Sequence, residues 1–221
     1  MCGRYTMHHP LKQIEMHFGV NATKAETTER YNISPTQSVP VVLEHEGSRL
    51  LDSFQWGLIP VWAKDPGIGN KMINARAETL ADKPAFKPAL SRRRCLIPAD
   101  GFYEWRKDGA LKQPMYVRRK DGELFAFAGL WETWKQEDGS PLHTCTIITT
   151  SANDAMRPIH ERMPVMLLPE DEALWLDVAG HGPADAMSVL APYPSGLLDI
   201  YPVDRRVNVP TVDDPTLLNS L

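Results

Sequence analysis

Hydrophobic residues at helical spacing near the start of the chain predict a short amphipathic helix over residues 11–18. Leu11, Ile14 and Phe18 fall on one face of this helix. Gly19 follows at the position where glycine often ends a helix, because it adopts the left-handed conformation without steric cost. The pattern therefore indicates one helix ahead of the first long strands.

Two further helices are predicted in the last third of the chain. Ser151, with Asp154 three residues later, resembles a capping box at the start of a helix. Pro169 is followed by two acidic residues and begins another helix, which we expect to end near Asp177.

The middle of the chain has the pattern of β-strands. Residues 41–44 and 50–56 flank a turn over residues 46–48, and the dipeptides Asp108-Gly109 and Asp121-Gly122 mark two further hairpins. These short connections favour antiparallel pairing.

Two segments are apolar on both faces and predict buried central strands, residues 124–130 and most of residues 143–149. Together with the helices they predict an α+β fold with curved antiparallel sheets or a partly open β-barrel and peripheral helices. A length of 221 residues suffices for one sizeable core, so we expect a single domain over residues 1–221.

Composition narrows the class of protein. The hydrophobic fraction of 43% and the charged fraction of 24% are typical of a globular chain, and 19 prolines predict long irregular segments. No apolar run is long enough to cross a bilayer, so we expect no membrane partner. Three cysteines without a CxxC pair favour a reduced intracellular chain, in which Cys95 and Cys145 belong to the core.

The charge distribution leaves a local nucleic-acid groove open. A formal net charge of -4 is weak evidence against a general nucleic-acid binder. Arginines nevertheless recur in short, otherwise polar segments, so a local basic groove remains compatible with the sequence. They include Arg4, Arg76, Arg157, Arg162 and the pair Arg205 and Arg206.

Cys2 directly follows Met1, and removal of Met1 would leave an α-amine and a thiol on one residue. Such a 1,2-aminothiol condenses with an aldehyde to an imine, which the neighbouring sulfur then closes to a five-membered thiazolidine, with proximity favouring ring closure. The expected substrate therefore carries an aldehyde. The competing interpretation is a small residue that happens to follow Met1.

Four internal segments are not explained by packing alone. Asn74-Ala75-Arg76-Ala77-Glu78-Thr79 lacks the apolar stripe of a core element, and Glu104 stands between aromatic residues before a hairpin turn. His160 lies on a proline-bounded loop, and the segment from Tyr201 to Asn208 reads as a closing strand. Structural roles are the alternative for each: a solvated hairpin glutamate, an ordinary loop histidine or a plain strand.

Six motifs in the same order resemble the SOS response-associated peptidase family, whose members shield abasic sites in single-stranded DNA. The resemblance covers nearly the whole chain, and so specific a series is hard to obtain by chance. The matching positions are residues 1–4 (Met-Cys-Gly-Arg), Tyr31, Asn32 and Pro35, Trp56, Gly57, Leu58, Pro60 and Trp62, residues 74–78, residues 101–105 and residues 159–164. Asp204 departs from the serine that is common in related sequences, which affects only the expected local backbone contacts.

The resemblance implies a covalent reaction between Cys2 and the ring-opened aldehyde of an abasic sugar. It implies proton transfer by Glu104, assistance by His160, and a holding role for Asn74. It further suggests phosphate contacts from Arg4, Arg76 and Arg162, and stacking surfaces on Trp56, Trp62 and Trp105. The implied partner is single-stranded DNA with abasic sites, bound without a cofactor by a monomer in the cytoplasm at the nucleoid.

Three other functions remain open at this point. One is a cysteine peptidase or amidohydrolase with an N-terminal nucleophile, including autoprocessing or lyase activity. The second is a DNA-binding module without chemistry, which would explain arginines and tryptophans but not Cys2, Glu104 and His160 together. The third is a metal protein, which is disfavoured because His8, His9, His143, His160 and the cysteines show no zinc-type spacing.

Overall fold

Five strands of the computed structural model, which describes residues 2–109 and 111–221, close into a barrel. The strands pair in the order β11-β10-β7-β4-β5, and β5 pairs again with β11. Their bounds are β4 (Ser38–His45), β5 (Ser48–Trp56), β7 (Arg94–Ala99), β10 (Phe125–Lys135) and β11 (Pro141–Ser151). The closing pair is parallel, with Cys145 opposite Trp56, whereas the other four pairs are antiparallel. Closure removes the exposed edges that an open sheet would have.

Three short strands extend the barrel sheet. They are β2 (Ala22–Thr23), which is parallel to β5, β6 (Asn74–Arg76), which is parallel to β11, and β12 (Arg162–Pro164), which is antiparallel to β11. The parallel pairings were not anticipated from the hairpin signals, because they join segments far apart in the sequence.

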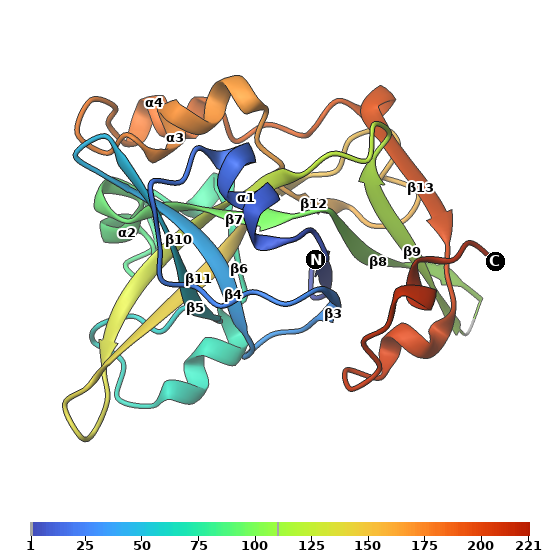
Figure 1. Ribbon diagram of the computed structural model, residues 1–221, viewed down its shortest axis with the longest axis horizontal. Coiled ribbons are helices and arrows are strands. Elements are labelled where there is room, and N and C mark those ends of the chain that lie inside the picture. The colour runs from blue at the N-terminus through green and yellow to red at the C-terminus, as the bar shows by residue number, and fades with distance from the viewer. Residues whose placement is uncertain (1, 110) are drawn as a thin grey trace.

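A second sheet of five antiparallel strands stays open and lies beside the barrel (Figure 1). Its order is β13-β9-β8-β1-β3, with bounds β1 (Tyr5–Met7), β3 (Arg30–Ile33), β8 (Gly101–Asp108), β9 (Leu111–Arg119) and β13 (Leu198–Pro202). The chain passes from barrel strand β7 to β8 through one residue, Asp100. This junction connects the two sheets directly.

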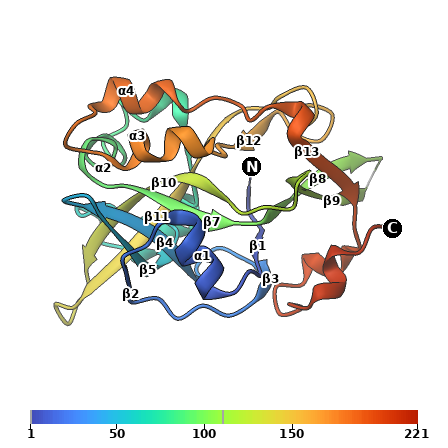
Figure 2. The ribbon, with the colours of Figure 1, turned by 45° about the horizontal axis from the view of Figure 1, so that its top comes forward.

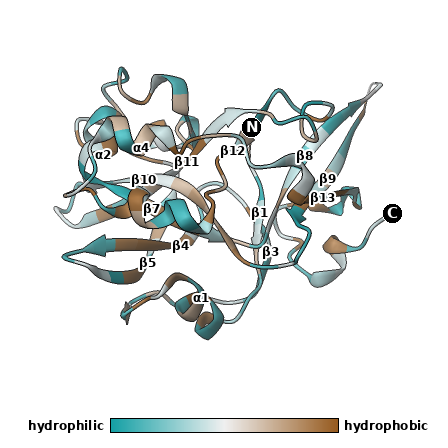
Figure 3. Cartoon of the chain, turned by 90° about the horizontal axis from the view of Figure 1, so that it is seen from above, coloured by the Kyte–Doolittle hydropathy of each residue, from teal (hydrophilic) through white to brown (hydrophobic). Residues whose placement is uncertain are grey.

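Apolar side chains fill the barrel and continue beneath the second sheet. All six residues of β7 are buried, and hydrophobic stretches are visible along β4 and β7 in Figure 3. Gly129 of β10 permits the close approach of β7, because a Cβ there would lie 2.9 Å from Cys95 Sγ. Tyr5 of β1 packs edge-on against Phe127 of β10, with ring centroids 5.7 Å apart. One apolar core thus includes residues of both sheets.

Short helices surround the sheets, and α2, α3 and α4 gather on one side of the barrel (Figure 2). The helices are α1 (Leu11–Phe18), α2 (Lys87–Arg92), α3 (Glu172–Leu176) and α4 (Pro183–Ser188). The 3-10 helices are η1 (Pro66–Lys71), η2 (Ala77–Thr79), η3 (Pro169–Asp171), η4 (Ser195–Leu197), η5 (Arg205–Asn208) and η6 (Pro215–Leu218). None of the described helices is long and apolar enough to cross a membrane.

The predicted α+β fold with a barrel is confirmed, and so are several of its elements. The first helix has the predicted bounds and ends at Gly19, with a left-handed φ of 61°. The turn between β4 and β5 has positive φ at Glu46 and Gly47, as a tight hairpin requires. The apolar segments around residues 124–130 and 143–149 are the buried strands β10 and β11.

Three local predictions are wrong. The Asp121-Gly122 turn is present, but it connects β9 of the open sheet to β10 of the barrel, so the two strands form no hairpin. Ser151 ends β11, where it pairs with Arg162 of β12, and the described residues after it form turns. The segment from Tyr201 to Asn208 is a strand only up to residue 202, after which η5 follows.

Candidate functional site

Cys2 lies just before β1, and contacts at its backbone and thiol hold it in place. The side-chain amide of Asn74 donates a hydrogen bond to the carbonyl oxygen of Cys2 at 2.7 Å. Asn74 begins β6, whose pairing with β11 fixes it against the barrel opposite Ile147. The buried Cys2 thiol points to the Arg4 carbonyl at 3.9 Å. The barrel, through Asn74, therefore positions Cys2, which leads into β1 of the open sheet.

Glu104 reaches the same place from β8. Antiparallel pairing sets Tyr5 opposite Phe102, and the Tyr103 amide donates to the Arg4 carbonyl at 2.9 Å, so β8 runs beside the start of β1. The Glu104 side chain is buried. Burial, and next the negative charge of Glu104, raise the pKa of the Cys2 thiol to about 12. The thiol is therefore protonated at neutral pH and needs a base when its sulfur attacks.

His160 lies on the loop between β11 and β12. Its Nδ1 accepts a hydrogen bond from the Arg162 amide at 3.0 Å, so the neutral ring carries its proton on Nε2. A backbone hydrogen bond of 3.0 Å from the His160 amide to the Met156 carbonyl closes the turn before it. The loop thus presents the ring with a defined tautomer.

Glu104 and His160 line one pocket of about 510 Å³. The other lining residues are Trp105, Leu111, Lys112, Arg205 and Asn208. A second hollow of about 470 Å³ shares Trp105, Lys112 and His160 with the first and continues to Arg157 and Lys107. We call the two hollows together the Trp105 groove.

The groove is locally basic although the chain has a net charge of -4. Four cations line it, Lys107, Lys112, Arg157 and Arg205, against the two carboxylates Glu104 and Glu161. A positive groove of this kind attracts a phosphate backbone. The charge of the groove is therefore more informative about a bound partner than the net charge of the whole chain.

Of the predicted stacking residues, only Trp105 lines the groove in the described part of the chain. Its Nε1 donates to Asn208 Oδ1 at 2.8 Å, which orients the ring. Trp56 is fully buried and donates to the Ile73 carbonyl at 2.9 Å, so it is not available to a base; the expected stacking role is wrong for this conformation. Trp62 is 57% exposed beside Val61 in the turn between β5 and η1, outside the described groove lining.

The predicted phosphate-binding arginines differ in how many hydrogen bonds their guanidinium groups make to other groups of the protein. Arg4 donates to Asn32 Oδ1 and to the Val207 carbonyl, each at 2.7 Å, and so ties β1 to β3 and η5. Asn32 also donates to the carbonyl of Val212 at 2.6 Å, which explains the Tyr31-Asn32 motif as a structural one. Arg4 therefore stabilises the fold through these hydrogen bonds.

Arg162 is the most constrained of the three. Its guanidinium forms two parallel hydrogen bonds with the Glu78 carboxylate, at 2.7 and 2.9 Å, and donates to the Thr149 carbonyl at 2.6 Å. The hydrogen bonds from Arg162 lower the pKa of Glu78. Arg76, at the end of β6, is exposed and lies close enough to contribute to the same shift. Arg76 thus has the more accessible charge.

Sequence reasoning overlooked Lys107, Lys112 and Asn208 as groove residues. Lys107 and Lys112 face each other across the β8–β9 hairpin. Like charges at opposing positions destabilise a hairpin, so such a pair indicates a role in binding. The predicted turn at Asp108-Gly109 already sets these two lysines opposite each other, so the sequence contained this signal. Asp204, the departure from the common serine, accepts a hydrogen bond from the Arg206 amide at 2.8 Å and caps η5. A serine can also cap in this way.

Comparisons with known proteins identify the family of the chain. The family model described as "SOS response associated peptidase (SRAP)" matches residues 1–210. The chain is 44% identical to the abasic site processing protein YoqW of Bacillus subtilis over 100% of both chains. It is 33% identical to the abasic site processing protein YedK of Escherichia coli, covering 82% of this chain and 80% of that protein.

The fold is likewise shared with a solved structure. A crystal structure of a Bacteroides thetaiotaomicron protein superposes with a TM-score of 0.91 at 28% identity, covering 100% of both chains. Because the family model matches almost the full length and YoqW aligns over the whole of both chains, the chain belongs to the SOS response associated peptidase family.

Proposed function

We propose that the protein captures abasic sites in single-stranded DNA by forming a thiazolidine between Cys2 and the sugar aldehyde. The observations that support this proposal are that Asn74 holds the Cys2 carbonyl, that the charge of Glu104 acts on the Cys2 thiol, and that Glu104 shares a pocket with His160. Relatives that are 44% and 33% identical are named abasic site processing proteins, which supports the same class of substrate. Under this proposal the protein acts in the DNA damage response, in the compartment that contains the DNA.

The reaction begins after a methionine aminopeptidase has removed Met1. The neutral α-amine of Cys2 attacks the aldehyde carbon, water leaves, and an imine remains. The thiol sulfur then adds to the imine carbon while its proton is passed to the nitrogen. The C=O bond is replaced by one C–N and one C–S bond, and one water is released. A reference pKa of about 7.7 to 8.0 for an α-amine leaves a useful neutral fraction at neutral pH.

Glu104 and His160 supply the proton transfers. The thiol is protonated at neutral pH, so Glu104, whose charge acts on it, accepts its proton as sulfur attacks. His160 carries its proton on Nε2 and donates it to the departing hydroxyl. Asn74 holds the Cys2 carbonyl and limits the rotation of the aminothiol.

Ring closure protects the DNA strand. An imine withdraws electrons from the sugar and promotes β-elimination, which cleaves the strand. Addition of sulfur makes that carbon tetrahedral and removes the electron sink. Lyase activity is therefore expected only where the thiol cannot close the ring.

The Trp105 groove binds the DNA around the captured sugar. Its four cations neutralise phosphates, and the Trp105 ring offers a face for a neighbouring base. Arg76, two residues after Asn74 in the sequence, contributes a further phosphate contact. A peptidase with a Cys2 nucleophile is less compatible with these contacts. Catalytic thiols attack as thiolates with a lowered pKa, whereas the pKa of Cys2 is raised.

The decisive experiment is intact mass spectrometry of the purified protein after incubation with single-stranded DNA that contains one abasic site. We expect a heat-stable adduct whose mass is the sum of both components minus one water. Cys2→Ala should give no stable adduct but an imine that borohydride traps, or strand cleavage. Cys145→Ala, which removes a buried barrel thiol, is the matched control and should crosslink normally.

A chain that retains Met1 or carries an extra residue before Cys2 should bind DNA without forming the stable adduct. Full crosslinking by such a chain, verified by mass, would show that the aminothiol is not the reacting group.

A further inference from the structure

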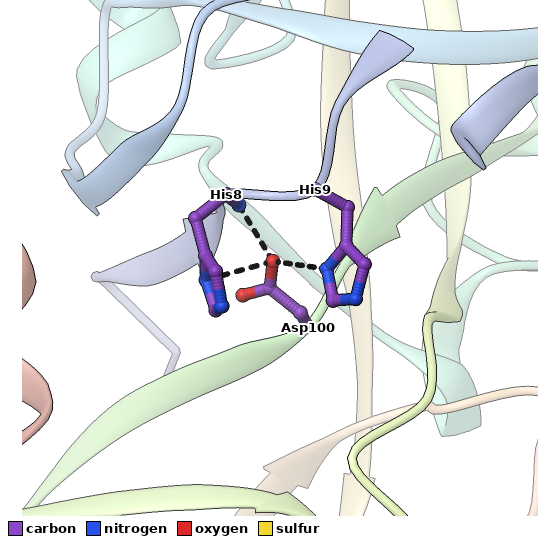
Figure 4. Close-up of side chains that lie close together, drawn as sticks. All are labelled: His8, His9 and Asp100. Atoms are coloured by element: carbon purple, nitrogen blue, oxygen red, sulfur yellow. Dashed lines mark hydrogen bonds and ion pairs between the residues drawn. The ribbon is translucent and has the colours of Figure 1, made fainter. Parts of the chain in front are cut away.

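Two histidines that follow β1 converge on one buried carboxylate at the junction between β7 and β8 (Figure 4). Asp100 Oδ2 lies 2.9 Å from His8 Nδ1 and 3.0 Å from His9 Nδ1. The Asp100 side chain is 2% exposed, whereas the two histidine side chains are 30% and 22% exposed. The cluster therefore combines a covered carboxylate with two rings that an ion can reach from solvent.

His8 distinguishes this cluster from a satisfied hydrogen-bond network. Its Nδ1 is buried and has no hydrogen-bond partner, although Asp100 Oδ2 is only 2.9 Å away, because the direction does not suit an N–H donor. The His8 backbone amide donates to the same Asp100 oxygen at 2.6 Å. Rotation of the ring would turn the unpartnered Nδ1 and Asp100 Oδ2 toward a shared cation, which would then satisfy both atoms.

We propose that His8, His9 and Asp100 bind a divalent transition-metal ion of the zinc class, with water completing the coordination. Two imidazole nitrogens and one carboxylate oxygen are a ligand set that such ions accept. Tetrahedral ligands at about 2.0 to 2.2 Å from zinc are separated by about 3.3 Å. The three donor atoms all lie within 4.8 Å of one another, so side-chain adjustments of up to about 1.5 Å would bring them to this spacing.

The surroundings of the cluster support its ligands from behind. The Thr6 hydroxyl contacts Asp100 Oδ1 at 2.5 Å and the Tyr116 hydroxyl at 2.8 Å, which orients the carboxylate. The His8 ring stacks on Tyr31, with centroids 5.2 Å apart. His9 Nδ1 lies at hydrogen-bond distance from Asp100 Oδ2, 3.0 Å, so the carboxylate is held at both of its oxygens.

The position of the cluster gives the ion a structural role. Strand β1 leads from Cys2 to the two histidines, and β8 leads from Asp100 to Glu104. An ion at one end of this strand pair would therefore fix the register that sets Cys2 beside Glu104 at the other end. Local spacing in the sequence could not show the site, because Asp100 is 91 residues away from His9.

The test is calorimetric titration of the chelator-treated full chain with zinc chloride, in a Cys2→Ala background so that the aminothiol does not bind zinc. We expect one ion per chain. His8→Gln and His9→Gln should each weaken binding by about 100-fold or more, because the loss of a partner behind a ligand already costs about 10- to 100-fold. His45→Gln is the matched control, because its side chain is 89% exposed and lies outside the cluster.

Two further readouts keep the result unambiguous. Cobalt should give the visible absorption of a low-coordinate nitrogen and oxygen site in the parent but not in His9→Gln. Zinc should raise the thermal midpoint of the parent, and this increase should disappear in both cluster variants. No ion retained by the parent, or equal affinity in His9→Gln and His45→Gln, overturns the proposal, whatever the outcome of DNA crosslinking.

Discussion

The closed barrel and the open sheet contain the same kinds of residue, but these residues have different roles in the two regions. Glu132 of the barrel is buried and paired with Arg93 at 2.7 Å, whereas the equally buried Glu104 of the open sheet acts on the Cys2 thiol and lines the Trp105 groove. Trp56 is sealed in the barrel, while Trp105 reaches the groove. Burial alone therefore does not separate structural from functional residues. What differs is whether the side chain also borders a space that a ligand can enter.

The two buried glutamates give the largest expected contrast. Glu104→Gln keeps the shape of the side chain but removes the proton acceptor, so adduct formation should slow by roughly 10²-fold. Glu132→Gln should leave the rate unchanged and lower the stability by about 1 to 3 kcal/mol, because Arg93 loses its charged partner. Single-turnover gel assays and urea unfolding measure the two quantities. Equal crosslinking rates for both variants would remove Glu104 from the mechanism.

The two tryptophans sharpen the comparison for DNA binding. Trp105→Ala should weaken binding of single-stranded DNA by about 1 to 3 kcal/mol through lost stacking. Trp105→Phe, which keeps a ring but loses the hydrogen bond to Asn208, should recover part of that loss. Trp56→Phe should bind normally but unfold more easily. Fluorescence anisotropy in a Cys2→Ala background provides the affinities, and unchanged binding by Trp105→Ala would place the bases elsewhere.

Glu172 extends the comparison to pH, because burial on the barrel side raises its pKa to about 7. An acid with a raised folded pKa contributes stability below its unfolded pKa of about 4.3 and loses it as the pH rises through the folded value. At about pH 8.5, Glu172→Gln should therefore be more stable than the parent, on the order of 2 kcal/mol. At about pH 4 the two chains should be equal.

Glu170→Gln is the control for this effect, since the neighbouring Glu170 side chain is exposed. Denaturant unfolding at both pH values provides the measurement. A difference between Glu172→Gln and the parent that does not change with pH would mean that the carboxyl group is not titrating in the folded chain.

The smallest expected effect concerns the arginines. If the exposed Arg76 contacts one phosphate, Arg76→Ala should reduce the slope of log affinity against log salt by about 0.7 for any single-stranded sequence. Arg118→Ala removes an exposed arginine that pairs with Asp199 on the β9–β13 side and should leave the slope unchanged. Anisotropy over a range of salt concentrations decides between them. Identical slopes for both variants would assign Arg76 to structure.

The sequence by itself determined the elements that depend on local rules. The helix over residues 11–18, its glycine end and the hairpin at Glu46 and Gly47 follow from period and turn chemistry, which act over a few residues. The ordered motifs also identified the family. Local reasoning failed at Ser151 because a capping pattern cannot show that the residue is already held in a strand by Arg162, eleven positions on.

Only the tertiary structure decided which of the chemically suitable residues meet. Parallel closure of β5 on β11 and the pairing of β6 with β11 place Asn74 at Cys2, bury Trp56 and leave Trp105 at the groove. The ion pair of Arg162 with Glu78 and the convergence of His8, His9 and Asp100 likewise join positions far apart in the sequence. Such contacts depend on strand register and chain closure, which local periodicity does not specify.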